Sequence, residues 1–243
     1  MSRNYSLLNG DSYALMESMP DSCVDVTITD PPYDEKTHTG ARASGGKLIA
    51  KSTIDFEPLE KEGIQRLVCE LLRVTRRWVV CFCSLEHLGA YKAAAGDSWI
   101  RGGFWRKTNA APQFTGDRPA QGGEGVAIMH RKGRKQWNGG GHHAFWAYPV
   151  ETGKDVRIHP AQKPLALMIE LVKLFSNKNE IIFDPFMGSG SIEEASLLNS
   201  RKVLGVELVE SYFNDAKERI EASVAGLTVA QMRAGQTTFG FGI

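Results

Sequence analysis

One apolar segment constrains the fold of this chain more than any other. The run Trp78-Val79-Val80-Cys81-Phe82 contains no charged residue and has the length of a β-strand. A strand that is apolar on both faces is typical of a parallel sheet with helices on both sides. Residues 57–77, which precede this run, carry apolar residues at helical spacing. The two patterns together predict an α/β fold with a buried, mostly parallel sheet.

Strand and helix patterns alternate along the rest of the chain, which supports the same fold class. Strands are expected at residues 5–8, 24–29, 103–105, 126–129, 180–184 and 203–208, and helices at 87–95, 164–176, 191–199 and 212–224. A long loop joins the strands at 103–105 and 126–129, so an antiparallel pair at the sheet edge is predicted. Residues 34–53 and 131–158 lack periodicity. We interpret them as mobile insertions in a single domain of residues 1–243.

The overall composition limits the class of protein. The chain has 243 residues, 42% of them hydrophobic, and 29 Lys and Arg residues against 28 Asp and Glu residues. These values are ordinary for a soluble globular protein, and a local basic face stays open. No apolar run is long enough to span a bilayer and no signal region opens the chain, so a cytosolic location is expected. The 4 cysteines include no Cys-x-x-Cys pair, and no metal site is expected.

A compact motif, Asp30-Pro31-Pro32-Tyr33, follows the strand predicted at residues 24–29. Asp30 can accept a hydrogen bond from an amino group, and the carbonyl of Pro31 is a second acceptor. Each residue before a proline is biased toward extended geometry, which stiffens Asp30 and Pro31. Tyr33 offers an aromatic face for stacking. This combination suits methylation of the amino group of a nucleobase.

A second motif, residues 181–191, combines a strand, a glycine turn and a helix start in the order Ile181-Ile182-Phe183-Asp184-Pro185-Phe186-Met187-Gly188-Ser189-Gly190-Ser191. The glycines let the backbone approach a ligand, but the third glycine of the dinucleotide fingerprint is absent. Glu207 ends the next strand, where an acid can bind ribose hydroxyls. Asp184 would repel a pyrophosphate and attract a cation. S-adenosylmethionine, which has a sulfonium, an ammonium and no phosphate, is therefore the expected cofactor.

From about Ser6 to about Glu218 the chain resembles the DNA amino-methyltransferases of the circularly permuted group, in which the catalytic motif precedes the cofactor motif. The resemblance implies a Rossmann-like S-adenosylmethionine-dependent methyltransferase fold with a seven-stranded sheet, mostly parallel, and one antiparallel strand. It also implies that Asp11 contacts the cofactor adenine, and that the segment from His159 to Pro164 packs on the methionine end of the cofactor. Lys163 in that segment either covers the cofactor carboxylate or only caps a helix start. The expected cofactor residues are Asp11, His159, Lys163, Asp184, Pro185, Phe186, Gly188, Ser189, Gly190, Ser191 and Glu207.

The resemblance makes double-stranded DNA the expected partner, and dimers are common in this permuted group. A loop from Trp105-Arg106-Lys107 to Glu124 resembles the family's loop beside the target-base pocket. A basic run after residue 130, next to a tryptophan and a glycine run, favours an arm that follows phosphates, although such runs are often only solvated turns. The residues expected to contact DNA are Asn109, Arg118, Arg131, Lys132, Arg134, Lys135 and Trp137.

The first residue of the catalytic motif bears on the target base. In this family an acid at that position commonly accompanies methylation of adenine N6, and a serine accompanies methylation of cytosine N4. Asp30 therefore favours adenine N6 in a base flipped out of the duplex. The alternatives are cytosine N4 with the same machinery, an RNA or protein amide target, and a DNA-binding relative that has lost catalysis.

Overall fold

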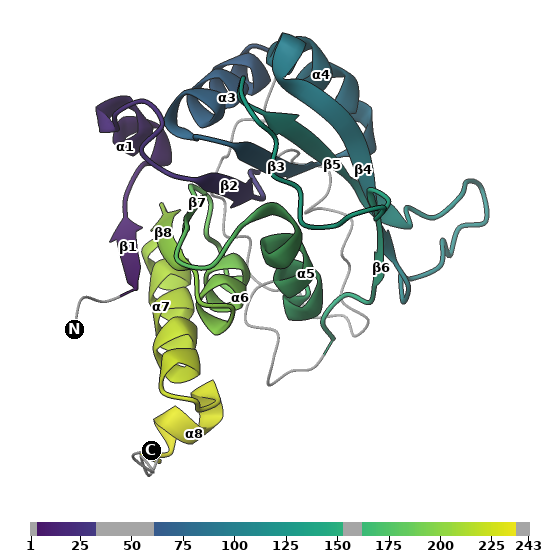
Figure 1. Cartoon of the computed structure of the whole chain (residues 1–243). Helices are drawn as coiled ribbons and strands as arrows, with labels where there is room; N and C mark the ends of the chain where they lie inside the picture. Colours follow the sequence, from purple (N-terminus) through teal and green to yellow (C-terminus); the bar gives the residue numbers. More distant parts are fainter. Residues whose placement is uncertain (1–3, 33–60, 153–161, 237–243) are drawn as a thin grey trace.

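The computed structural model describes residues 4–32, 61–152 and 162–236. Its strands are β1 (Tyr5–Asn9), β2 (Val26–Thr29), β3 (Trp78–Cys83), β4 (Trp99–Lys107), β5 (Gly123–His130), β6 (Phe145–Tyr148), β7 (Ile181–Asp184) and β8 (Lys202–Glu207). Its α-helices are α1 (Ser12–Ser18), α3 (Lys61–Val74), α4 (Leu88–Ala95), α5 (Leu165–Phe175), α6 (Ser191–Leu198), α7 (Glu210–Val224) and α8 (Val229–Arg233). Short 3-10 helices occupy Leu85–His87 and Gly96–Ser98 (Figure 1).

The strands form one sheet in the order β1-β8-β7-β2-β3-β5-β4-β6. All neighbouring pairs from β1 to β3 are parallel, β5 is antiparallel to both of its neighbours, and β6 is parallel to β4. Within the described residues, β5 is thus the single reversed strand, which confirms the predicted α/β fold with a mostly parallel sheet. The described sheet has eight strands and not the seven expected, because β6 extends one edge.

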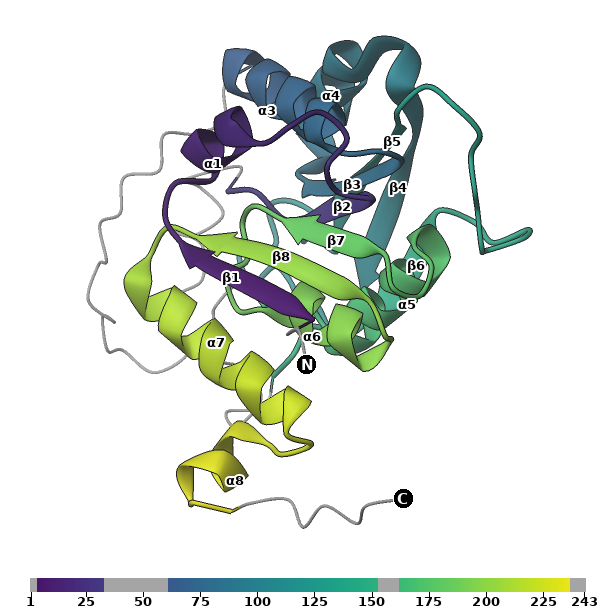
Figure 2. The same ribbon diagram turned by 60° about the vertical axis from the view of Figure 1, so that its left-hand side comes forward.

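Two helical layers cover the sheet. Helices α1, α3 and α4 lie on one face, and α5, α6 and α7 lie on the other (Figures 1 and 2). All six residues of β3 are buried. Val80 and Phe82 pack in the cluster that includes α5, whereas Val79 and Cys81 pack in the cluster that includes α3. Burial of each such side chain stabilises the fold by about 1.5–3 kcal/mol, which explains why the β3 sequence is apolar without alternation.

The segment 131–158 differs in part from the predicted mobile insertion. Strand β6 within it pairs with β4, and the side chain of Trp146 is only 2% exposed. The half-buried ring of Trp137 lies 5.1 Å from the ring of Phe175. The predicted edge position of the antiparallel pair is also wrong, because β5 lies between β3 and β4 and β6 forms the edge. The four residues of β6, between Ala144 and Pro149, are too few to show a strand period.

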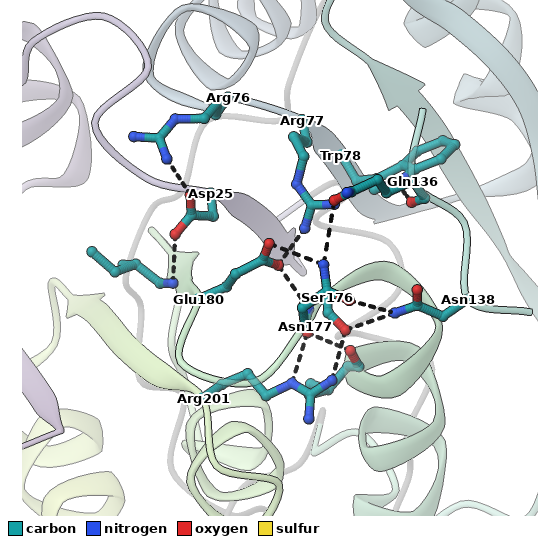
Figure 3. Close-up of polar contacts among 12 residues, drawn as sticks. Asp25, Arg76, Arg77, Trp78, Gln136, Asn138, Ser176, Asn177, Glu180 and Arg201 are labelled. Carbon is teal, nitrogen blue, oxygen red and sulfur yellow. Dashed lines mark hydrogen bonds and ion pairs between the residues drawn. The ribbon is translucent and has the colours of Figure 1, made fainter. Parts of the chain in front are cut away.

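The parallel strands define two ends of the sheet, which are distinct from its outermost strands. We call the end where β2, β7 and β8 finish the carboxyl edge, and the end where they begin the amino edge. A polar network closes the amino edge (Figure 3). Arg77 forms an ion pair with Glu180 and donates to Oε1 of Gln136 at 2.8 Å, and Trp78 Nε1 donates to the Gln136 carbonyl at 2.6 Å. Asn138 Nδ2 donates to the carbonyl of Ser176 at 2.9 Å. The chain that follows β5 is therefore fixed to the amino edge.

No helix in the described part of the chain is long and apolar enough to cross a membrane.

Candidate active site

The two sequence motifs meet at the carboxyl edge. Asp30 directly follows β2, Asp184 ends β7, and Glu207 ends β8. These three strands are adjacent and parallel, with Thr27 opposite Phe183 and Asp184 opposite Gly205. In an open α/β sheet, ligands bind outside the carboxyl ends of the strands. The fold thus brings the catalytic and cofactor motifs together at the place where a ligand is expected.

Asp184 joins the two motifs through hydrogen bonds. Its Oδ1 accepts from the hydroxyl of Thr29 at 2.7 Å and from the backbone N–H of Phe186 at 3.0 Å. Its Oδ2 is buried and has no partner among the described residues. Burial, together with the charges of Asp30 and Glu207, raises the pKa of Asp184 to about 7, although the two hydrogen bonds act to lower it. A cation beside Oδ2 would favour the ionised carboxylate.

The glycine turn after β7 has a backbone conformation that favours glycine. Gly188 and Gly190 have φ angles of 51° and 72°, which place them in the left-handed region. The N–H of Gly188 donates to Oε2 of Glu207 at 2.8 Å, and the N–H of Val209 donates to Oε1 at 2.8 Å. Glu207 is therefore held by the backbone, and each carboxylate oxygen keeps a lone pair for a second donor. This arrangement fits the ribose hydroxyls of the expected cofactor.

The other predicted cofactor residues in the described part of the chain lie around this turn. Pro185 is buried, and the half-buried ring of Phe186 makes an edge contact with Tyr13. The hydroxyls of the buried Ser189 and Ser191 are 3.2 Å apart. Asp11 caps α1 by accepting from the N–H of Tyr13 at 2.8 Å, two residues after Asn9, which is paired with Glu207. His159 and Tyr33 lie outside the described residues.

Asp30 is held on one side only. Its Oδ2 accepts a hydrogen bond from the ammonium of Lys163, whereas its Oδ1 is buried without a partner among the described residues. Burial raises the pKa of Asp30, and the positive charge of Lys163 opposes that rise. Pro31 is buried and Pro32 is half-buried. Oδ1 is therefore free to accept a hydrogen bond from a ligand.

Lys163 also links Asp30 to two residues to which the sequence analysis assigned no individual role. Its ammonium lies 3.0 Å from Oε2 of Glu124, and Oε1 of Glu124 lies 2.6 Å from the ammonium of Lys107. The two lysines lower the pKa of Glu124 to about 2 in spite of its burial. Lys107 ends β4 and Glu124 lies near the start of the reversed β5, so both lie at the carboxyl edge. The direction of β5 is the signal that would have found them.

The residues expected to contact DNA divide between the two edges. The loop that carries Asn109 and Arg118 leaves β4 and enters β5 at the carboxyl edge. Asn109 exchanges two hydrogen bonds with the backbone of Val150, at 2.7 and 3.0 Å, and exposed Arg118 pairs with Asp117. The basic run instead follows the end of β5, at the amino edge, where Arg131 donates to the carbonyl of Arg73 at 3.1 Å.

The structure therefore does not bring the basic run to Asp30. Lys132, Arg134 and Lys135 are exposed, and Trp137 is half-buried against the core. A DNA contact by these residues stays a prediction about a surface away from the carboxyl edge.

Acidic, histidine and cysteine side chains of the described ranges form no group of three that could hold a metal ion.

Similarity to known proteins agrees with this geometry. The structure of M1.HpyAVI in complex with SAM superposes with a TM-score of 0.64 at 26% identity, over 88% of this chain and 99% of that one. The PvuII DNA methyltransferase, described as cytosine-N4-specific, superposes with a TM-score of 0.69 over 98% of this chain and 95% of its own length. At 14% identity this second match concerns the fold alone. The fold is that of the S-adenosylmethionine-dependent methyltransferases.

Sequence comparison defines the group within that class. A family model described as DNA methylase, covering N6 and N4 enzymes, matches residues 103–218. YubD of Escherichia coli (strain K12), a protein named only as a methylase, is 29% identical over 88% of this chain and 89% of its own length. The type II methyltransferase M.HinfI of Haemophilus influenzae is 24% identical over 88% of this chain and 68% of its own. Over residues 103–218 the chain is thus similar to the DNA methylases of the N6/N4 group.

Proposed function

We propose that this protein transfers a methyl group from S-adenosylmethionine to the exocyclic N6 of adenine in double-stranded DNA. The similarity to N6/N4 DNA methylases supports the reaction class, and the acid at the start of the catalytic motif supports adenine. The observation that carries the proposal is the carboxylate of Asp30. It lies at the carboxyl edge next to the Asp184 and Glu207 site, and its buried Oδ1 has no partner among the described residues.

The residues around the glycine turn fit the proposed cofactor. Glu207 would hold the ribose hydroxyls, and the carboxylate of Asp184, with its unpartnered Oδ2, would attract the positive end. The left-handed Gly188 and Gly190 keep this turn free of side chains where the backbone meets a ligand. When bound there, S-adenosylmethionine supplies a methyl group on a sulfonium.

The role of Asp30 follows from the chemistry of the adenine amino group. The lone pair of N6 is delocalised into the ring, so the nitrogen is a poor nucleophile. Hydrogen bonds from its two N–H groups to Asp30 Oδ1 and to the Pro31 carbonyl would localise that lone pair. The amino nitrogen then forms the N–C bond while the S–C bond breaks, and one amino proton passes to water. Asp30 stabilises the positive charge that develops on nitrogen, and positioning contributes further to the rate.

Access to N6 requires the base to leave the duplex, which costs a few kcal/mol. Stacking of the base on Tyr33, which lies outside the described residues, would offset about 1–3 kcal/mol of that cost.

A methyl-transfer assay tests this proposal. Duplex DNA is incubated with the protein and S-adenosylmethionine carrying a labelled methyl group, then digested to nucleosides and measured by mass spectrometry. We expect N6-methyladenine. N4-methylcytosine would overturn the base assignment and leave the reaction class intact, whereas unlabelled DNA would overturn the activity.

The variant Asp30→Ala links that activity to the proposed site. It is expected to lose methyl transfer by at least about 100-fold, a typical effect of removing one group that stabilises developing charge. Cofactor affinity, measured by calorimetry, should change little, because Asp30 faces the base. The exposed Asp97→Ala is the matched control, and near-normal turnover in Asp30→Ala would refute the mechanism.

A further inference from the structure

Four charged side chains of alternating sign lie in a row at the carboxyl edge. The row, which we call the charge chain, runs from Asp30 to Lys163 to Glu124 to Lys107. The side chains of Lys163, Glu124 and Asp30 are only 6%, 11% and 18% exposed. Each member comes from a different part of the fold: after β2, before α5, within β5 and at the end of β4.

Burying the charged side chain of Lys163 costs free energy, and a residue with only a packing role would avoid that cost. A buried ammonium loses its hydration, and the loss must be offset by well-placed acceptors. Here two carboxylates share it, and its Nζ also lies 5.0 Å from the centre of the Phe82 ring and 5.9 Å from the Trp105 ring. An apolar side chain would fill such a place with less loss of hydration. The charge of Lys163 therefore calls for a reason beyond stability.

The contact of Lys163 with Asp30 is one-sided, and this points to its role. The ammonium occupies Oδ2 and leaves Oδ1 without a partner among the described residues. With one oxygen fixed, the carboxylate cannot rotate freely about its Cβ–Cγ bond, so the direction of the free oxygen is set. Glu124, held in turn by Lys107 at 2.6 Å, keeps the ammonium in place.

We propose that Lys163 is a positioning residue of methyl transfer, which fixes and charges the carboxylate of Asp30, and that Glu124 and Lys107 hold Lys163 for this task. The inference rests on the proposed function of Asp30. It differs from the sequence-based expectation that Lys163 binds the carboxylate of the cofactor.

The groups that face Asp30 determine how each change affects its pKa. Lys163 and Lys107 lower the pKa of Asp30, whereas Glu124 raises it. Asp184 on β7 and the thiols of Cys81 and Cys83 on β3 also interact with the Asp30 charge. Loss of Lys163 should therefore raise the pKa of Asp30, and loss of the Glu124 charge should lower it. A general loss of stability in both variants would not shift the pKa of Asp30 in opposite directions.

The pH dependence of single-turnover methyl transfer tests the proposal in wild type, Lys163→Met, Lys163→Arg and Glu124→Gln. Lys163→Met should slow the methyl-transfer step at least about 10-fold and move the acidic limb of its pH profile up by about one unit or more. Lys163→Arg should restore part of the rate, and Glu124→Gln should move the limb to lower pH. KM for S-adenosylmethionine should stay within about 3-fold in each variant. Exposed Lys92→Met is the matched control, and thermal unfolding verifies that each variant is folded.

Two results would refute the proposed role of Lys163 independently of the proposed function. If wild type methylates DNA but Lys163→Met raises KM for S-adenosylmethionine without moving the pH profile, Lys163 serves the cofactor and the proposal is wrong. A carbon-13 NMR titration of the Asp30 carboxyl gives a readout that needs no activity. In this titration Lys163→Met should raise the pKa of Asp30 and Glu124→Gln should lower it, and unchanged values would overturn the inference even if wild type were inactive.

Discussion

Asp184 should make the stability of the fold decrease between about pH 4 and pH 7. Burial raises the pKa of this carboxyl from 3.8 to about 7, so the folded state binds the proton more tightly than the unfolded state. The stabilisation is fully present below the unfolded pKa and is lost as the pH rises through the folded pKa. In Asp184→Asn the side chain cannot ionise, and the oxygen that accepts from Thr29 and Phe186 is retained. This variant should therefore show no such loss of stability as the pH rises.

The size of the effect follows from the same values. The interval from 3.8 to about 7, at about 1.4 kcal/mol for each pH unit, corresponds to about 4 kcal/mol. Buried Glu193, whose two carboxylate oxygens have no partner among the described residues, interacts with Asp184 and also has a raised pKa through burial. Measuring the full pH-dependent difference in stability therefore also requires Glu193→Gln and the double variant, because the carboxyls of Asp184 and Glu193 titrate as a coupled pair.

Urea unfolding without cofactor at pH 4.5, 6, 7 and 8 measures this dependence. The variant Asp184→Asn should be more stable than wild type by about 1 kcal/mol at pH 4.5 and by up to about 4 kcal/mol at pH 8. The exposed Asp97→Asn should follow wild type throughout. Parallel stability curves for wild type and Asp184→Asn would refute the reasoning, because they would mean that Asp184 ionises without cost in the folded protein.

Two further predictions concern the stability of the fold. A methyl group at Gly205 would come within 2.7 Å of Glu193 Oε1 and 2.8 Å of Met187 Sδ, so Gly205→Ala should destabilise the fold by about 1–3 kcal/mol in urea unfolding, and an unchanged midpoint would contradict the close packing below the glycine turn. Arg77→Ala removes an ion pair with Glu180 at the amino edge and should lower the free energy of unfolding by about 2 kcal/mol, with no change in cofactor affinity. A change in affinity would show that the two edges are coupled.

The sequence predicted the parts of the fold that depend on local pattern. The apolar run 78–82 became the central β3, and the glycine turn followed its strand and led into a helix. The meeting of Asp30 with Asp184 was also predictable, since both motifs follow strands that end at one edge of a parallel sheet. Such features need only neighbouring residues and the rules of strand direction.

Features that depend on distant pairing were not predictable. Lys163 and Asp30 are 133 residues apart, and no spacing rule relates them. The reversed direction of β5, which takes residue 131 to the amino edge and brings Glu124 to the carboxyl edge, was by contrast implied by the predicted antiparallel pair. Strand β6 forms because its backbone pairs with β4 and Trp146 finds a buried place, and neither condition is visible in four residues.

The hydrogen bonds that build the site have a consequence for synthesis of the protein. Asn9 bonds to the carbonyl of Glu207 across 198 residues, and Thr29 bonds to Asp184 across 155. Pairing across such separations is slow and begins only when both partners are present. During synthesis strand β2 and Asp30 emerge before strand β7, so they have no β7 beside them until residue 184 has left the ribosome. Chains that lack β7 and β8 are therefore unable to form the site, and the proposed methyl transfer requires both strands to be synthesised first.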